Sequence, residues 1–123
     1  MENEIMKAML EIKVTQLADD VARTLLMEEV SYEFMSRNYP VSIEKATEHM
    51  TKIYKVIASL REHQDLALRY GNKEVMSQCW VLEKPLYELM EKFRISAYKM
   101  DNSIYCIAYF YIKFWINYTP PCR

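Results

Sequence analysis

The amino-acid sequence predicts an all-α protein, a bundle of four to five helices, and three observations lead to this fold class. The 123 residues include one glycine, Gly71, whereas the tight turns of an antiparallel sheet protein need several. The first 37 residues contain neither proline nor glycine and are rich in good helix formers. Apolar residues recur at steps of three and four over long stretches, which is the spacing of one helix face.

A long first helix is expected from Glu2 to about Arg37. Its apolar residues recur at helical spacing and would form one buried stripe, made of Met6, Met9, Leu10, Val14, Leu17, Val21, Leu25 and Phe34. The pattern loosens near residues 30–32, where we consider a break in the helix. Pro40 ends the helix, because the residue before a proline is pushed out of the helical region.

A central helix is expected over residues 43–70, with Ser42 as its N-cap. Its apolar residues form a heptad seam that Gln64 interrupts once, at Ile43, Ala46, Met50, Ile53, Ile57, Leu60, Gln64 and Ala67. Gly71 is expected to end this helix in the left-handed conformation, and Asn72 is expected to cap the helix that follows.

Two shorter helices are expected next, separated near Pro85. Proline in a helix interior costs about 3 kcal/mol, so we place a break near Glu83 and start a new helix at Lys84. The inner faces would hold Val75, Met76, Cys79, Trp80 and Leu82 in the first of these helices, and Leu86, Leu89, Met90, Phe93, Ala97 and Met100 in the second.

The aromatic segment at residues 103–118 reads SIYCIAYFYIKFWINY, with Lys113 as its one charge. As a helix, it would align Tyr105, Tyr109, Lys113 and Asn117 in a polar ridge beside a wide apolar arc. As a strand, it would need another copy of the chain to pair with, because every other segment is expected to be helical. We favour the helix. Its sixteen residues would reach about 24 Å, short of the roughly 30 Å of hydrocarbon in a bilayer, so no transmembrane segment is expected.

Charge and cysteine content predict an intracellular, cytoplasmic protein in a reducing compartment. The net charge of −1 gives no overall attraction to nucleic acid or to an anionic membrane. The N-terminus shows no pattern of a secretory signal peptide. Cys79, Cys106 and Cys122 are widely spaced and odd in number, which favours reduced thiols. Cys122, near the end, is the one that could form an interchain disulfide.

No catalytic, metal or cofactor site is expected, so we predict that the protein is not an enzyme. His49 and His63 each follow a glutamate directly and do not match the Glu-x-x-His spacing of helical metal sites, so we expect solvated histidines. The cysteines lack the close spacing of a zinc site, and one glycine cannot form a phosphate-binding loop. Acidic neighbours dilute the basic residues near Lys52 and Lys55, which leaves nucleic-acid binding as a weaker third option.

Protein–protein contacts are the expected function, because the aromatic segment holds more apolar surface than a small bundle can hide. The candidate interface residues are Tyr105, Tyr109, Phe110, Tyr111, Phe114, Trp115 and Tyr118. We expect a single domain over residues 1–123, with a short tail at 119–123, that self-assembles as a structural homo-oligomer. The alternative is a small helical binding module that docks on another protein and inhibits or regulates it. The low glycine and high tyrosine and methionine contents resemble those of small virus-encoded helical proteins, so a viral origin is a further expectation.

Overall fold

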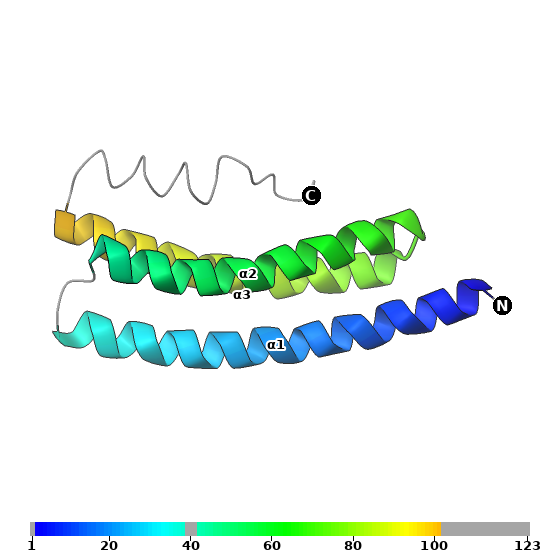
Figure 1. Cartoon of the computed structure of the whole chain (residues 1–123), viewed down its shortest axis with the longest axis horizontal. Helices are drawn as coiled ribbons and strands as arrows, with labels where there is room; N and C mark the ends of the chain where they lie inside the picture. The colour runs from blue at the N-terminus through cyan, green and yellow to red at the C-terminus, as the bar shows by residue number, and fades with distance from the viewer. Residues whose placement is uncertain (1, 39–41, 102–123) are drawn as a thin grey trace.

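The computed structural model describes residues 2–38 and 42–101, and these residues form three helices and no strands. The helices are α1 at Glu2–Asn38, α2 at Ile43–Arg69 and α3 at Lys73–Asp101. Successive helices run in opposite directions, with α2 and α3 packed together and α1 along one side of the pair (Figure 1). The predicted all-α bundle is confirmed. The count of four to five helices is wrong for the described residues, and the helix expected over residues 103–118 lies outside them.

The first turns of α2 and α3 are capped by the residues that the sequence predicts. The Ser42 side chain accepts a hydrogen bond from the backbone N–H of Lys45 at 3.2 Å, which caps α2. The Asn72 side chain accepts a hydrogen bond from the backbone N–H of Val75 at 3.0 Å, which caps α3. Each cap supplies an acceptor for an N–H group that has no carbonyl partner in the first turn of its helix.

The end of α2 is a Schellman motif built on Gly71. This residue has a φ of +68°, in the left-handed region that favours glycine, as predicted. Its backbone N–H donates to the Leu68 carbonyl at 3.0 Å, and the N–H of Asn72 donates to the Ala67 carbonyl at 2.8 Å. These two bonds satisfy carbonyls at the end of α2 and turn the chain directly into α3.

Helix α3 runs through Pro85 without interruption, so the predicted break near Glu83 is wrong. A proline has no N–H to donate to the carbonyl four residues earlier, which here belongs to Val81. Val81 is 66% exposed, so this carbonyl lies on a side of α3 that water reaches. Glu83 and Leu86, which flank the proline, are both fully buried. Packing on both sides of Pro85 therefore outweighs its local cost.

Helix α1 is also continuous, and the break considered near residues 30–32 is absent. Four residues of its predicted stripe are buried, namely Leu10, Val14, Leu17 and Val21. Met9 and Phe34, which were expected on the same stripe, are 57% and 71% exposed. The inner face continues instead through the buried Glu28 and the half-buried Tyr32, neither of which belonged to the predicted stripe.

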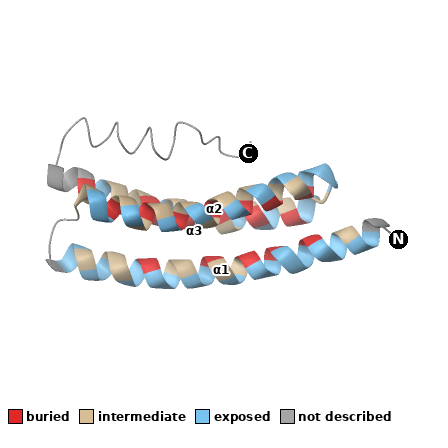
Figure 2. Ribbon diagram, viewed as in Figure 1, coloured by how far each residue is buried: buried red, intermediate tan, exposed pale blue. Residues whose placement is uncertain are grey.

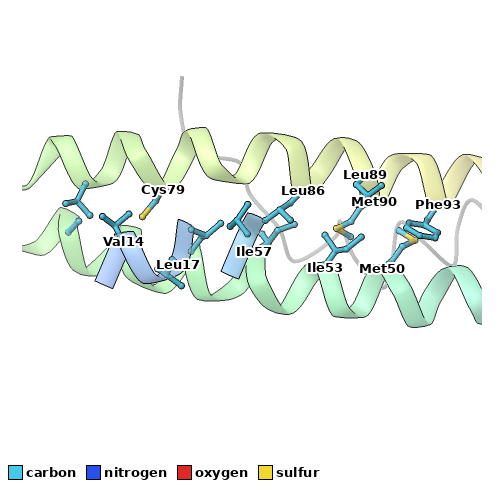
Figure 3. Packing of buried hydrophobic residues seen from close by; sticks show 14 of the residues in the cluster. Val14, Leu17, Met50, Ile53, Ile57, Cys79, Leu86, Leu89, Met90 and Phe93 are labelled. Carbon is cyan, nitrogen blue, oxygen red and sulfur yellow. The ribbon is translucent and has the colours of Figure 1, made fainter. Parts of the chain in front are cut away.

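The core lies mainly between α2 and α3, and α1 packs across both. Figure 3 shows Met50, Ile53 and Ile57 of α2 pointing toward side chains of α3 that include Leu86 and Phe93. The buried residues of α2 are Ala46, Met50, Ile53, Ile57, Leu60, His63 and Ala67. The buried hydrophobic residues of α3 are Val75, Cys79, Leu86, Leu89, Met90, Phe93 and Ala97.

The predicted inner faces of α2 and α3 are therefore largely confirmed, with a few differences. In α2 the buried polar residue is His63, whereas Gln64, which was placed on the seam, is half-buried. Of the residues predicted on the inner face of α3, Met76, Trp80 and Leu82 are half-buried. The predicted inner residue Met100 lies beyond the side chains that the structure describes. Within residues 2–38 and 42–101, no helix combines the length and the apolar character that a membrane span requires.

Candidate protein interface

The side of α1 that faces away from α2 and α3 is exposed (Figure 2), and it carries large apolar side chains. Eleven large hydrophobic residues are exposed in the described part of the chain, and seven of them belong to α1. They are Ile5, Met9, Ile12, Leu26, Met27, Val30 and Phe34. At about 100° of rotation per residue, all seven fall within a sector of about 100° that lies opposite the buried side of the helix. We call this surface the outer face of α1.

The outer face has the spacing of a coiled-coil seam. Eight positions follow one another at alternating steps of four and three residues, namely Ile5, Met9, Ile12, Gln16, Asp19, Arg23, Leu26 and Val30. The five apolar residues among them are 57% to 68% exposed. Single exposed apolar residues are ordinary on a protein surface, whereas several that gather on one helix face are typical of a contact site. The three polar positions lie together in the middle of the row.

The remaining exposed hydrophobic residues are scattered over the bundle. Leu68 and Tyr70 lie at the end of α2, whereas Val81 and Ile95 lie more than three turns apart on α3. None of these residues continues into a row comparable to the one on α1. The outer face of α1 therefore holds more exposed large apolar side chains than any other face of a helix in the described residues.

Two of the grooves in the described residues that lie where α1 meets the other helices differ in size. The larger, of about 590 Å³, is lined by α1 and α3 residues, namely Val14, Thr15, Ala18, Glu74, Ser77, Gln78, Val81 and Leu82. The smaller, of about 410 Å³, lies between α1 and α2 and includes Ser59 and His63. The Ser59 hydroxyl donates to the Lys55 carbonyl at 3.2 Å, and His63 contacts a backbone carbonyl. Ser59 and His63 of the smaller groove therefore do not form the hydrogen-bonded nucleophile and base of a hydrolytic site.

A buried polar contact joins α1 to α2 near the end of α1. His49 Nδ1 lies 2.5 Å from Glu28 Oε2, and the side chains are 14% and 7% exposed. The ring nitrogen donates and the carboxylate accepts, so each group satisfies the other away from water. The prediction that His49 is solvated is wrong, because the helix register turns it toward Glu28.

Phe93 of α3 completes this cluster. The His49 ring stacks on Phe93 with centroids 5.1 Å apart and planes 6° apart. The Tyr32 ring meets Phe93 edge to face at 5.2 Å, and the Ser96 hydroxyl donates to the Tyr32 hydroxyl oxygen at 3.2 Å. Residues of all three helices therefore meet at one level of the bundle. We call Glu28, Tyr32, His49, Phe93 and Ser96 the Glu28 cluster.

His63 makes a second buried polar contact, at the opposite end of the bundle. The residue is 5% exposed, and its Nε2 donates to the Leu10 carbonyl of α1 at 2.9 Å. Because Nε2 carries the proton in this contact, it is not available as a metal ligand. The prediction that His63 is solvated is therefore also wrong, and the contact fixes α1 against the end of α2.

The third buried polar group is Glu83, which is fully buried in α3. Arg61 of α2 lies alongside it, with Nη1 at 3.8 Å from Glu83 Oε2. Cys79 lies one helical turn before Glu83 and is also buried. Burial and the nearby Glu83 carboxylate raise the pKa of the Cys79 thiol to about 11. The thiol is therefore protonated at neutral pH, which makes it a poor nucleophile and a poor metal ligand.

The described residues contain no group of three or more histidine, cysteine, aspartate and glutamate side chains that could hold a metal ion. The candidate interface residues predicted from the sequence, Tyr105 to Tyr118, lie outside the described residues. The outer face of α1 was not predicted, because Met9 and Phe34 were assigned to the buried stripe. The signal was present in the sequence, since Ile5, Ile12 and Val30 fit a second row of three- and four-residue steps, half a turn from the first.

Comparison of this chain with protein-family models, curated proteins and solved structures finds no match.

Proposed function

We propose that this chain is a non-enzymatic structural protein that assembles through protein–protein contacts, and that the outer face of α1 is one of its contact surfaces. The observation that carries the proposal is the concentration of exposed apolar side chains on this one helix face. A face of this kind loses unfavourable contact with water when another apolar surface covers it. The coiled-coil spacing of the row is suited to a helical partner.

The buried polar contacts support this function by holding α1 in place. The Glu28 cluster fixes the C-terminal part of α1, and the contact between His63 and the Leu10 carbonyl fixes its N-terminal part. A helix held at Leu10 and at Glu28 presents the outer face between these positions in a fixed orientation, which reduces the entropy lost on binding.

The aromatic segment at residues 103–118 is the second contact surface that we propose. Aromatic side chains are enriched at the energetic centres of protein interfaces. We expect Trp115→Ala to weaken assembly by about 2 kcal/mol or more while the thermal stability of the bundle stays close to that of the wild type. Light scattering gives the first quantity and thermal unfolding followed by circular dichroism gives the second. A loss of stability with assembly intact would instead make Trp115 an ordinary core residue.

The alternative function is that of a binding module that docks on a different protein and inhibits or regulates it. The outer face of α1 supports this function as well, because an exposed amphipathic helix can fill the apolar groove of another protein. In this case the purified chain would remain a stable monomer or dimer. A viral origin remains an expectation from composition.

Multi-angle light scattering of the purified chain over a hundredfold range of concentration tests the proposal. Self-assembly predicts a molar mass that rises with concentration above the 14.8 kDa of a single chain. A molar mass that stays at the monomer value throughout would rule out self-assembly and favour the binding module. Salt dependence of any binding to a DNA or RNA oligonucleotide, in a separate titration, tests the weaker third option of a nucleic-acid binder.

A further inference from the structure

We infer that the occupant of the outer face of α1 is the same face of a second copy, in an antiparallel pair of α1 helices related by a two-fold axis. This inference rests on the proposed function, because it names the partner of the surface described there. In a two-fold pair, each residue that contacts a second residue is contacted by it in return, so the surface has to be complementary to itself. The sequence of the outer face meets this condition.

Six of the eight positions match their own reversed order in polarity, and the exception is Ile12, which is set opposite Arg23 of the partner subunit. Reversal sets Ile5 opposite Val30 of the partner subunit and Met9 opposite Leu26 of the partner subunit. Because the pairs are reciprocal, four layers of apolar contact form, two at each end of the paired helices. All four residues are at least 57% exposed in the single chain, so pairing removes apolar surface from water in each layer.

Polar residues meet in the middle of the same register. Gln16 faces Asp19 of the partner subunit, so that an amide donor meets a carboxylate acceptor. Ile12 faces Arg23 of the partner subunit, whose methylene groups can cover an apolar side chain while its charged end stays in water. The two-fold axis passes between the levels of Gln16 and Asp19.

Charges beside the row favour the antiparallel direction. The Lys13 side chain borders the row on the same edge as Asp20, and reversal brings Lys13 close to Asp20 of the partner subunit, twice in each pair. Within each chain Asp20 also pairs with Arg23. A parallel pair in the same register would instead set Asp19 against Asp19 and Arg23 against Arg23 of the two copies, and like charges directly opposite one another are unfavourable.

The size of the contact predicts a dimer of moderate affinity. The row from Ile5 to Val30 is about 38 Å long and about 10 Å wide, so it covers about 400 Å² in projection on each copy, below the roughly 800 Å² of a standard interface. We therefore expect a dissociation constant in the micromolar range and a dimer that forms as concentration rises.

A charge exchange in the full-length chain tests this pairing. Lys13→Glu alone sets a glutamate near Asp20 of the partner subunit, and Asp20→Lys alone sets a lysine near Lys13 of the partner subunit. Each single variant is expected to weaken dimerisation about tenfold, because two attractive pairs become two repulsive ones. The double variant restores opposite charges and is expected to return within about threefold of the wild type. Sedimentation velocity gives the dissociation constants, and circular dichroism confirms that each variant is folded.

The outcomes separate this inference from the proposed function. Recovery of dimerisation in the double variant supports the antiparallel pair. The double variant contains both substitutions that weaken dimerisation singly, so recovery has to come from the restored attraction between them. Association that is unchanged in the single variants, or that stays weak in the double variant, would overturn this pairing while leaving self-assembly in place. A wild-type chain that is monomeric at every concentration would overturn both.

Discussion

The contact between Glu28 and His49 shows how a single residue can contradict a simple pattern and still stabilise the bundle. A glutamate on the inner face of α1 is costly unless a donor reaches it, because a buried carboxylate loses its hydration. His49 supplies that donor at 2.5 Å, and the ring of Phe93 stacks on the His49 ring. The three residues come from three helices, so each fixes the register of the other two.

We predict that His49→Leu lowers the free energy of unfolding by about 3 kcal/mol or more, because it leaves the Glu28 carboxylate buried without its donor. The double variant Glu28→Leu with His49→Leu is expected to recover most of this loss, since two apolar side chains can pack where the polar pair stood. Urea unfolding of the two variants and the wild type measures both effects.

Additive losses in the double variant would contradict this account of the Glu28 cluster. They would mean that the two side chains stabilise the bundle through separate contacts rather than through each other.

The sequence could not reveal these partners, although it contains both residues. Glu28 and His49 are 21 positions apart and lie on different helices, so their contact depends on how α1 and α2 are rotated against each other. The same holds for His63, whose acceptor is the Leu10 carbonyl, 53 positions away. Periodicity assigns a face to each residue, but it does not show which polar groups meet across two helices.

At the scale of the element, Pro85 shows why a local rule can fail. The rule that proline breaks a helix concerns the lost hydrogen bond and the clash with the preceding turn. It does not include the burial of Glu83, Leu86 and the residues that follow, which keeps the whole of α3 packed on α2. The helix therefore continues at a local cost.

We predict that Pro85→Ala raises the free energy of unfolding by about 1–3 kcal/mol, because alanine restores the N–H that can donate to the Val81 carbonyl. Chemical unfolding followed by circular dichroism at 222 nm, a standard helix signal, measures the change. An unchanged or lower stability would show that packing of the proline ring is worth more than the restored hydrogen bond.

Helix α1 shows the opposite difficulty, because it carries apolar residues on two faces. The inner row through Leu10, Val14 and Leu17 is confirmed as core, and it was readable from spacing alone. The outer row through Ile5, Ile12 and Val30 has the same spacing. Spacing alone assigns Met9 to the outer row, but it could not decide which of the two rows is buried. The packing of α2 and α3 on one side of α1 decides this.

For the whole molecule, the sequence predicted the class of fold and the connections better than the number of helices. Ser42, Gly71 and Asn72 act as predicted, because caps and left-handed turns depend on local chemistry. The number of helices depends on packing between distant segments, which is why α3 was divided at Pro85. The proposed assembly depends in turn on which side chains remain exposed once the three helices have packed.

A matched pair of valines gives the most direct test of the claim that the outer face of α1 is a contact surface. Val30 lies on that face and is 61% exposed, whereas Val81 lies on α3 and is 66% exposed. Substitution by glutamine makes either site polar without lowering helix propensity, so both variants are expected to fold like the wild type.

The measurement is sedimentation equilibrium of the wild-type chain, Val30→Gln and Val81→Gln at the same concentrations. We predict that the wild type associates and that Val81→Gln associates equally well. Val30→Gln is expected to weaken association by about tenfold or more, because the apolar contact of Val30 with Ile5 of the partner subunit is lost twice in each dimer. Equal association constants for Val30→Gln and the wild type, with both variants folded, would contradict the claim.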